Sequence, residues 1–118
     1  MKYLEAMAII KEEYDIKIVA NHAILIYTGL TYDGCNSFCV VLYNLGDKAI
    51  LTDLGRTNEV FDEVGDETWI ELCDSHGFEF NHWHIQKDFN SIDDVDEFIK
   101  FLDFISVKFF DEVEDFDD

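Results

Sequence analysis

Two aspartates flank the strongest strand pattern of this 118-residue chain. Asp33 precedes the apolar run Phe38–Tyr43 and Asp53 ends the run Ala49–Thr52, so a hairpin would bring both carboxylates to one region. Such a pair can hold Mg²⁺ in a metal-dependent enzyme. A nuclease of this kind also needs a lysine shortly after the second acid, whereas Leu54-Gly55-Arg56 follows here. We therefore favour a structural role, in which Asp53 accepts hydrogen bonds from turn amides, over catalysis.

Three cysteines and one histidine have spacings that occur in zinc sites. Cys35-x3-Cys39 and Cys73-x2-His76 would together supply a Cys₃His ligand set. However, Cys39 lies within an apolar strand pattern and Cys73 on the apolar stripe of a predicted helix, and free cysteines are among the most buried residues. Buried thiols without a metal are the favoured interpretation, and these four residues are weak zinc candidates.

No other pattern in the chain predicts an enzyme or a cofactor. A glycine-rich phosphate loop and a basic patch are both absent from the sequence, so we expect neither nucleotide binding nor direct nucleic-acid binding. No apolar run reaches the roughly 18 residues of a membrane span. The odd number of cysteines argues against a disulfide framework. We expect a soluble cytoplasmic protein that does not bind membranes.

The element that must position these residues is the hairpin Ser37–Gly55, predicted to be the centre of the fold. Its β-branched and aromatic residues form two strand patterns around the turn residues Asn44, Gly46 and Asp47. The other predicted elements, in chain order, are a helix at Tyr3–Tyr14, two strands within Ile16–Thr28 joined at Asn21-His22, a short helix within Arg56–Gly65, a helix at Glu67–His76 capped by Asp66 and closed by Gly77, a small hairpin or bent strand at Phe78–Ile85 turning at Asn81-His82, and a long helix opened by Ser91.

The long helix carries an apolar stripe that must pack against the sheet. Its members are Val95, Phe98, Ile99, Leu102, Ile105 and Phe109. The Ser91 hydroxyl is expected to cap the amide of Asp94. Phe101, Phe104 and Phe110 lie off the stripe and either widen it or face a partner. The sequence thus predicts a single α+β domain at residues 1–110, with a small, mostly antiparallel sheet covered by the N- and C-terminal helices and acidic helices on one side.

The charge distribution is the most unusual property of the sequence. Residues 1–58 hold 7 acids and 5 bases, whereas residues 59–118 hold 20 acids and 3 bases, a net charge of −17. This exceeds the roughly 2–8 charges that suffice for solubility of a small domain. Residues 111–118 form an acidic tail, and acids at a helix C-terminus oppose the helix dipole, so we expect the tail to fray. Such a field attracts basic surfaces and repels nucleic acid.

The acids of the second half are predicted to form a partner-binding acidic face. Because B-DNA carries one charge per roughly 1.7 Å, a net −17 matches about 30 Å of duplex. The proposed members are Glu59, Asp62, Glu63, Asp66, Glu67, Asp93, Asp96, Asp103, Asp111, Glu112, Glu114, Asp115, Asp117 and Asp118.

The central hairpin also resembles a known family. Asp33 in a loop, the strand Phe38–Tyr43, a turn and then Ile50-Leu51-Thr52-Asp53-x-Gly55 resemble a bacterial and phage domain of unknown function, marked by a Leu-Thr-Asp-x-Gly turn. The resemblance covers roughly residues 3–105 and implies a fold and a bacterial or phage origin, but no activity. The acidic tail and the Cys35–Cys39 pair depart from the family pattern.

By size and charge the chain is also similar to phage anti-CRISPR and anti-restriction proteins. The leading hypothesis is a non-enzymatic acidic inhibitor that mimics nucleic-acid charge in the cytoplasm of a bacterial host cell. Its partner would be a basic nucleic-acid-binding protein such as a CRISPR effector or a restriction nuclease. The alternative is an accessory or antitoxin-like interaction module with an exposed aromatic surface. A metal-dependent enzyme using Asp33 and Asp53 is third.

Overall fold

The computed structural model of the protein describes the backbone of residues 1–114 and the side chains of residues 1–110. The elements in chain order are α1 (Tyr3–Glu13), β1 (Ile16–Ala20), β2 (Ala23–Ile26), β3 (Val40–Asn44), β4 (Ala49–Thr52), α2 (Arg56–Val60), α3 (Asp66–His76), β5 (Glu79–Asn81), β6 (His84–Asp88) and α4 (Asp93–Glu114). The predicted α+β class is confirmed.

The six strands form one antiparallel sheet in the order β1-β2-β3-β4-β6-β5. The β3–β4 hairpin occupies the two middle positions, as predicted, although β3 begins at Val40 rather than at Phe38. Leu42 pairs with Leu51 in its ladder. The first pair of strands turns at Asn21-His22, also as predicted.

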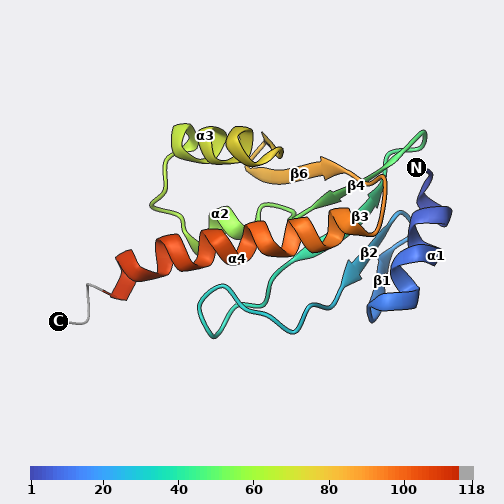
Figure 1. The fold of residues 1–118 in the computed structure, drawn as a ribbon, viewed down its shortest axis with the longest axis horizontal. Helices are drawn as coiled ribbons and strands as arrows, with labels where there is room; N and C mark the ends of the chain where they lie inside the picture. Colours follow the sequence, from blue (N-terminus) through green and yellow to red (C-terminus); the bar gives the residue numbers. More distant parts are fainter. Residues whose placement is uncertain (115–118) are drawn as a thin grey trace.

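The core lies between one face of the sheet and the helices. Because side chains alternate along a strand, Ile24, Leu42 and Leu51 share a face, and all three are fully buried in the core. Figure 1 shows α1 and α4 lying across the sheet. The predicted stripe of α4 is buried here except for Ile99, which is half-buried. Burial of each large apolar side chain contributes roughly 1.5–3 kcal/mol before entropy is subtracted.

Two predicted helix starts are wrong in detail. The residue that caps α3 is Gly65, in an extended conformation, and Asp66 is already helical. At α4, the Asp94 amide donates to the main-chain oxygen of Ser91 at 3.1 Å instead of to its hydroxyl. The Asp94 carboxylate accepts hydrogen bonds from the amides of Asn90 and Ser91, at 2.7 and 3.0 Å. A carboxylate there also faces the positive end of the helix dipole, which a hydroxyl cannot exploit to the same extent.

The second hairpin exists, but its turn lies one residue later than predicted. Asn81 pairs with His84, so His82 and Trp83 form the turn. Both have positive φ, 51° and 66°, as a type I′ turn requires.

The long helix extends into the predicted acidic tail. Its backbone runs to Glu114. Residues 115–118 and the side chains of residues 111–114 lie outside the described part of the chain, so fraying of the tail remains a prediction. Within the described residues, no helix combines the length and apolar character that crossing a membrane requires.

Candidate functional site

Asp53 is the centre of the Leu-Thr-Asp-x-Gly turn that follows β4. Its side chain is fully buried, and its carboxylate accepts hydrogen bonds from the amides of Gly55 at 2.9 Å, Thr57 at 3.2 Å and Ile85 at 2.8 Å. The first two bonds fix the turn into α2, and the third ties that turn to β6. Burial raises the pKa of the Asp53 carboxyl, while these amide bonds oppose the shift. The predicted role of Asp53 as an acceptor for turn amides is confirmed.

Local geometry also explains why the last residue of this motif is glycine. Gly55 has a φ of 80°, in the left-handed region. A Cβ atom there would lie 3.2 Å from Cδ2 of His84 and 3.4 Å from the main-chain oxygen of Trp83. Glycine therefore allows both the turn and the close approach of the β5–β6 hairpin.

Asp33 organises the loop before β3. Its carboxylate accepts hydrogen bonds from the amides of Cys35 and Asn36 and from the Asn36 side chain, at 2.9, 2.7 and 2.7 Å. These bonds, the Asn36 amide first, hold the pKa of Asp33 below its usual value. The carboxylate is therefore a fixed anion at neutral pH.

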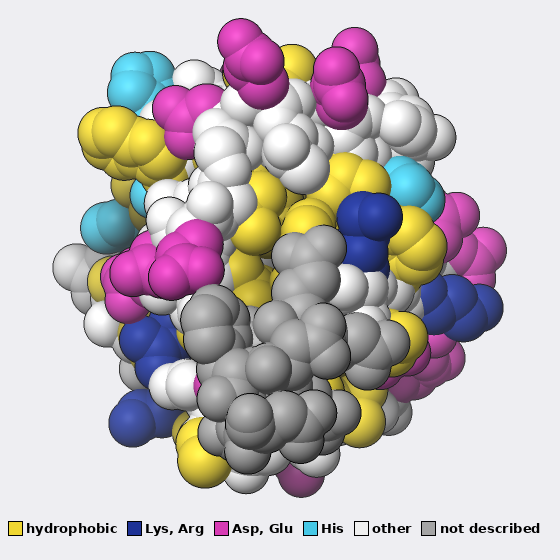
Figure 2. Space-filling view, turned by 90° about the vertical axis from the view of Figure 1, so that its left-hand side faces the viewer, with side chains coloured by type: hydrophobic (Ala, Val, Ile, Leu, Met, Phe, Trp, Pro, Cys, Tyr) yellow, Lys and Arg dark blue, Asp and Glu magenta, His cyan; other side chains and the backbone are white. Residues whose placement is uncertain are grey.

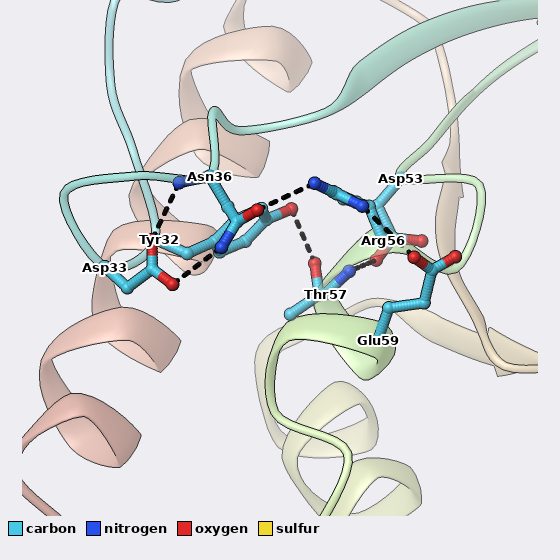
Figure 3. A network of polar contacts seen from close by, with 7 residues as sticks. All are labelled: Tyr32, Asp33, Asn36, Asp53, Arg56, Thr57 and Glu59. Carbon is cyan, nitrogen blue, oxygen red and sulfur yellow. Dashed lines mark hydrogen bonds and ion pairs between the residues drawn. The ribbon is translucent and has the colours of Figure 1, made fainter. Parts of the chain in front are cut away.

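A polar network joins this loop to the turn after β4 (Figure 3). The Arg56 guanidinium donates to Asn36 Oδ1 at 2.8 Å and contacts the Glu59 carboxylate at 3.1 Å. The Tyr32 hydroxyl is hydrogen-bonded to Thr57 Oγ1 at 2.7 Å. Sequence reasoning missed this network, because its partners are 20 and 25 residues apart and polar residues in a loop carry no periodic signal.

The network does not form the magnesium site that was considered for Asp33 and Asp53. Each carboxylate is engaged by amides of its own segment, and Arg56 lies between the loop and the turn (Figure 3). Among the described residues, no group of three or more His, Cys, Asp and Glu side chains could hold a metal ion.

The four zinc candidates are not brought together either. Cys35 is exposed, Cys39 is half-buried and Cys73 is buried. Burial raises the pKa of Cys39 to about 11 and that of Cys73 to about 12, so both remain neutral thiols, which are poor ligands and nucleophiles. His76 instead contacts the rings of Phe101 and Phe104, with centroids 4.9 and 4.8 Å away.

The described members of the predicted acidic face are all exposed. They lie at α2, α3 and the link between them, and along α4: Glu59, Asp62, Glu63, Asp66, Glu67, Asp93, Asp96 and Asp103. Glu59 pairs with Arg56 and Asp96 with Lys100. Figure 2 shows acidic side chains at separate places around the end of the molecule where α4 ends, with hydrophobic side chains between them. The tail members of the face lie outside the described side chains.

In the described part of the chain, two grooves border α4. One, of about 370 Å³, is lined by Thr31, Tyr32, Asp33, Gly34, Asp103, Ser106, Val107 and Phe110. The other, of about 270 Å³, is lined by His76, Phe78, Glu97, Lys100, Phe101 and Phe104. Of the three phenylalanines off the stripe, Phe101 is buried and widens it, whereas Phe104 is 43% exposed and Phe110 is half-buried.

Comparisons of the chain with protein-family models, with curated proteins and with solved structures found no match. The resemblance to the Leu-Thr-Asp-x-Gly family remains a prediction, and the geometry of the turn explains why Asp53 and Gly55 suit that motif as structural residues.

Proposed function

We propose that the protein is a non-enzymatic acidic inhibitor that mimics the charge of nucleic acid. Its partner would be a basic nucleic-acid-binding protein of a bacterial host, such as a CRISPR effector or a restriction nuclease. The observation that carries the proposal is the excess of exposed carboxylates on α2, α3 and α4, in a half of the chain with 20 acids and 3 bases.

The bases of this half do little to neutralise that excess. Lys87 is engaged by Asp94 and Glu97 at the start of α4, at 3.0 and 2.8 Å, and Lys100 by Asp96 at 2.9 Å. Among the described residues, Asp66, Glu67, Asp93 and Asp103 remain exposed on α3 and α4, helices that the core holds in place. Ordered charges lose little conformational entropy on binding, which favours tight association with a rigid basic groove.

Salt-dependent capture tests the proposal. The full chain is immobilised and exposed to a nuclease-treated bacterial extract, and the retained proteins are identified and eluted with a NaCl gradient. We expect nucleic-acid-binding proteins to be retained, to elute as salt rises and to be displaced by added duplex DNA, because the protein and the DNA would occupy the same groove. Retention that ignores both salt and duplex would contradict the proposal.

Two matched variants separate the acidic face from net charge. The acid-neutralised variant carries E59Q, D62N, E63Q, D66N and E67Q. The control variant removes the same number of exposed acids from the first half of the chain, by E5Q, E12Q, E13Q, D15N and D47N. The first should lose most of the retention and the second should keep most of it. Equal losses would mean that only overall charge matters.

The exposed side chain of Phe104 supports a second candidate function, that of a protein-interaction module. Phe104 is 43% exposed beside His76, at the rim of the smaller groove. An accessory or antitoxin-like module would use such a surface for apolar contact with its partner. F104A would then abolish retention at every salt concentration, whereas the inhibitor proposal expects F104A to leave the salt elution unchanged.

A further inference from the structure

We propose that the groove of about 370 Å³ beside α4 binds one arginine side chain of the partner protein. We call it the loop–α4 groove, and its lining residues are Thr31, Tyr32, Asp33, Gly34, Asp103, Ser106, Val107 and Phe110. The inference rests on the proposed function, because it takes the partner to be basic. The proposed contact gives the acidic protein one specific binding site for its partner, in addition to the general attraction between an acidic and a basic surface.

The groove is built by two separate elements. One side is the loop that Asp33 organises, with Tyr32 buried beneath it and hydrogen-bonded to Thr57. The other side is a single face of α4, since Asp103, Ser106, Val107 and Phe110 follow helical spacing. Ser106 is buried, and its hydroxyl donates to the main-chain oxygen of Leu102 at 2.8 Å. The groove is therefore held open by groups already engaged within the fold.

Both charged residues that line the groove are acidic, one on each side. Asp33 Oδ1 accepts two amide hydrogen bonds and Oδ2 accepts one from the Asn36 side chain. A carboxylate can accept about four hydrogen bonds, so Oδ2 retains capacity for a further donor. Asp103 is exposed on the α4 side. A cation between them would meet a carboxylate from either side, and no lysine or arginine is among the described lining residues.

The rest of the lining selects arginine over a small cation. Val107 is 61% exposed and Phe110 is half-buried, so the groove offers apolar surface next to its carboxylates. An arginine side chain matches this pattern, because its methylene stem covers apolar surface and its weakly hydrated guanidinium stacks on an aromatic ring and donates to a carboxylate.

Nuclear magnetic resonance with a small probe tests the groove directly. The probe is N-acetyl-arginine N-methylamide, titrated into the isotope-labelled full chain. We expect saturable amide shifts confined to residues 31–36 and 103–110. N-acetyl-norleucine N-methylamide has an apolar stem without the charge, and it should give much smaller shifts. Shifts spread evenly over all acidic segments, or equal shifts with the neutral probe, would overturn the inference.

Single substitutions assign the contact. D103N removes a carboxylate that lies on the exposed side of α4, so it should leave the fold intact and weaken probe binding by about threefold to fivefold, as for loss of a partly exposed ion pair. D33N should weaken it at least as much. E5Q removes the same charge from an exposed site on α1 and should have no effect. Equal weakening by E5Q and D103N would show that the probe senses only net charge.

The result is independent of the capture experiment. If the probe binds in the groove but no protein is captured in a salt-dependent way, the arginine site is supported and the inhibitor function is rejected. Retention without probe binding would leave the inhibitor function and reject the groove as its contact.

Discussion

The Asp53 carboxylate accepts a hydrogen bond from the amide of Ile85 at 2.8 Å, which joins the turn after β4 to a strand 32 residues later. This bond, with those from Gly55 and Thr57, makes one buried side chain the junction of β4, α2 and β6. Asp53, which was considered with Asp33 as a possible magnesium ligand, thus has the favoured structural role, because it joins three elements of the fold.

Replacing Asp53 by alanine should destabilise the fold strongly. D53A leaves three amides without their acceptor in a fully buried site, and an unsatisfied buried donor costs about 1–3 kcal/mol. We expect the free energy of unfolding, measured in urea, to fall by about 3 kcal/mol or more. D47N, which removes an exposed acid from the β3–β4 turn, is the control and should change stability by less than about 0.5 kcal/mol. A D53A protein as stable as D47N would refute the role assigned to Asp53.

The Gly55 position allows a test that separates backbone strain from crowding. G55A places a Cβ atom at positive φ and within 3.2 Å of the His84 ring, so we expect a loss of about 2–3 kcal/mol. Gly46 has a similar positive φ of 98°, but a Cβ atom there meets nothing within 4 Å. G46A should therefore lose only about 1 kcal/mol, the strain alone. If G55A and G46A lower the free energy of unfolding equally in urea, the His84 side chain moves away at little cost, and close packing does not explain the glycine.

The order of elements was predictable because each carries a local signal. The two apolar strand runs before Gly55, the stripe from Val95 to Phe109 and the left-handed Gly77 at the end of α3 all match the structure. The helix starts differ only in which neighbouring residue forms the cap, whereas the turn of the second hairpin is set by strand pairing. Asn81 favours a turn, yet its pairing with His84 moves the turn to His82-Trp83.

The polar network was beyond sequence reasoning for a different reason. Arg56 and Asn36 meet only because the loop before β3 folds beside the turn after β4. Tyr32 was not singled out, although it is 2% exposed and hydrogen-bonded to Thr57. Tertiary pairs of this kind leave no spacing pattern in a single sequence. Neither the network nor the loop–α4 groove could therefore have been predicted without the three-dimensional structure.

Asp33 should make stability depend on acid pH. Its pKa is lowered in the folded protein by hydrogen bonds to the ionised form, so the stabilisation is fully present above the unfolded pKa, about 3.9, and is lost as pH falls through the lower folded pKa. D33N cannot ionise. The difference in free energy of unfolding between the wild type and D33N should be constant from pH 7 to about 5 and shrink towards pH 2. Urea titrations at several pH values measure it, and a difference that does not change with pH would contradict the lowered pKa.

Finally, because the surface is acidic, the Tm of the protein should rise when NaCl is added. With 27 acids against 8 bases, repulsion between like charges opposes the compact state, and NaCl shortens the Debye length from about 10 Å at 0.1 M to about 3 Å at 1 M. The exposed Lys100–Asp96 ion pair is weakened by the same screening, but such pairs contribute only about 0–1 kcal/mol. We expect Tm, followed by circular dichroism, to rise by about 4 °C or more over this range, which corresponds to a gain in the free energy of unfolding on the order of 1 kcal/mol.

The Tm of the acid-neutralised variant should rise less with salt than that of the control variant, because its substitutions lie in the half of the chain with a net charge of −17. A fall in Tm with salt would mean that ion pairs, and not repulsion, dominate the surface, and would weaken the case for an exposed acidic face.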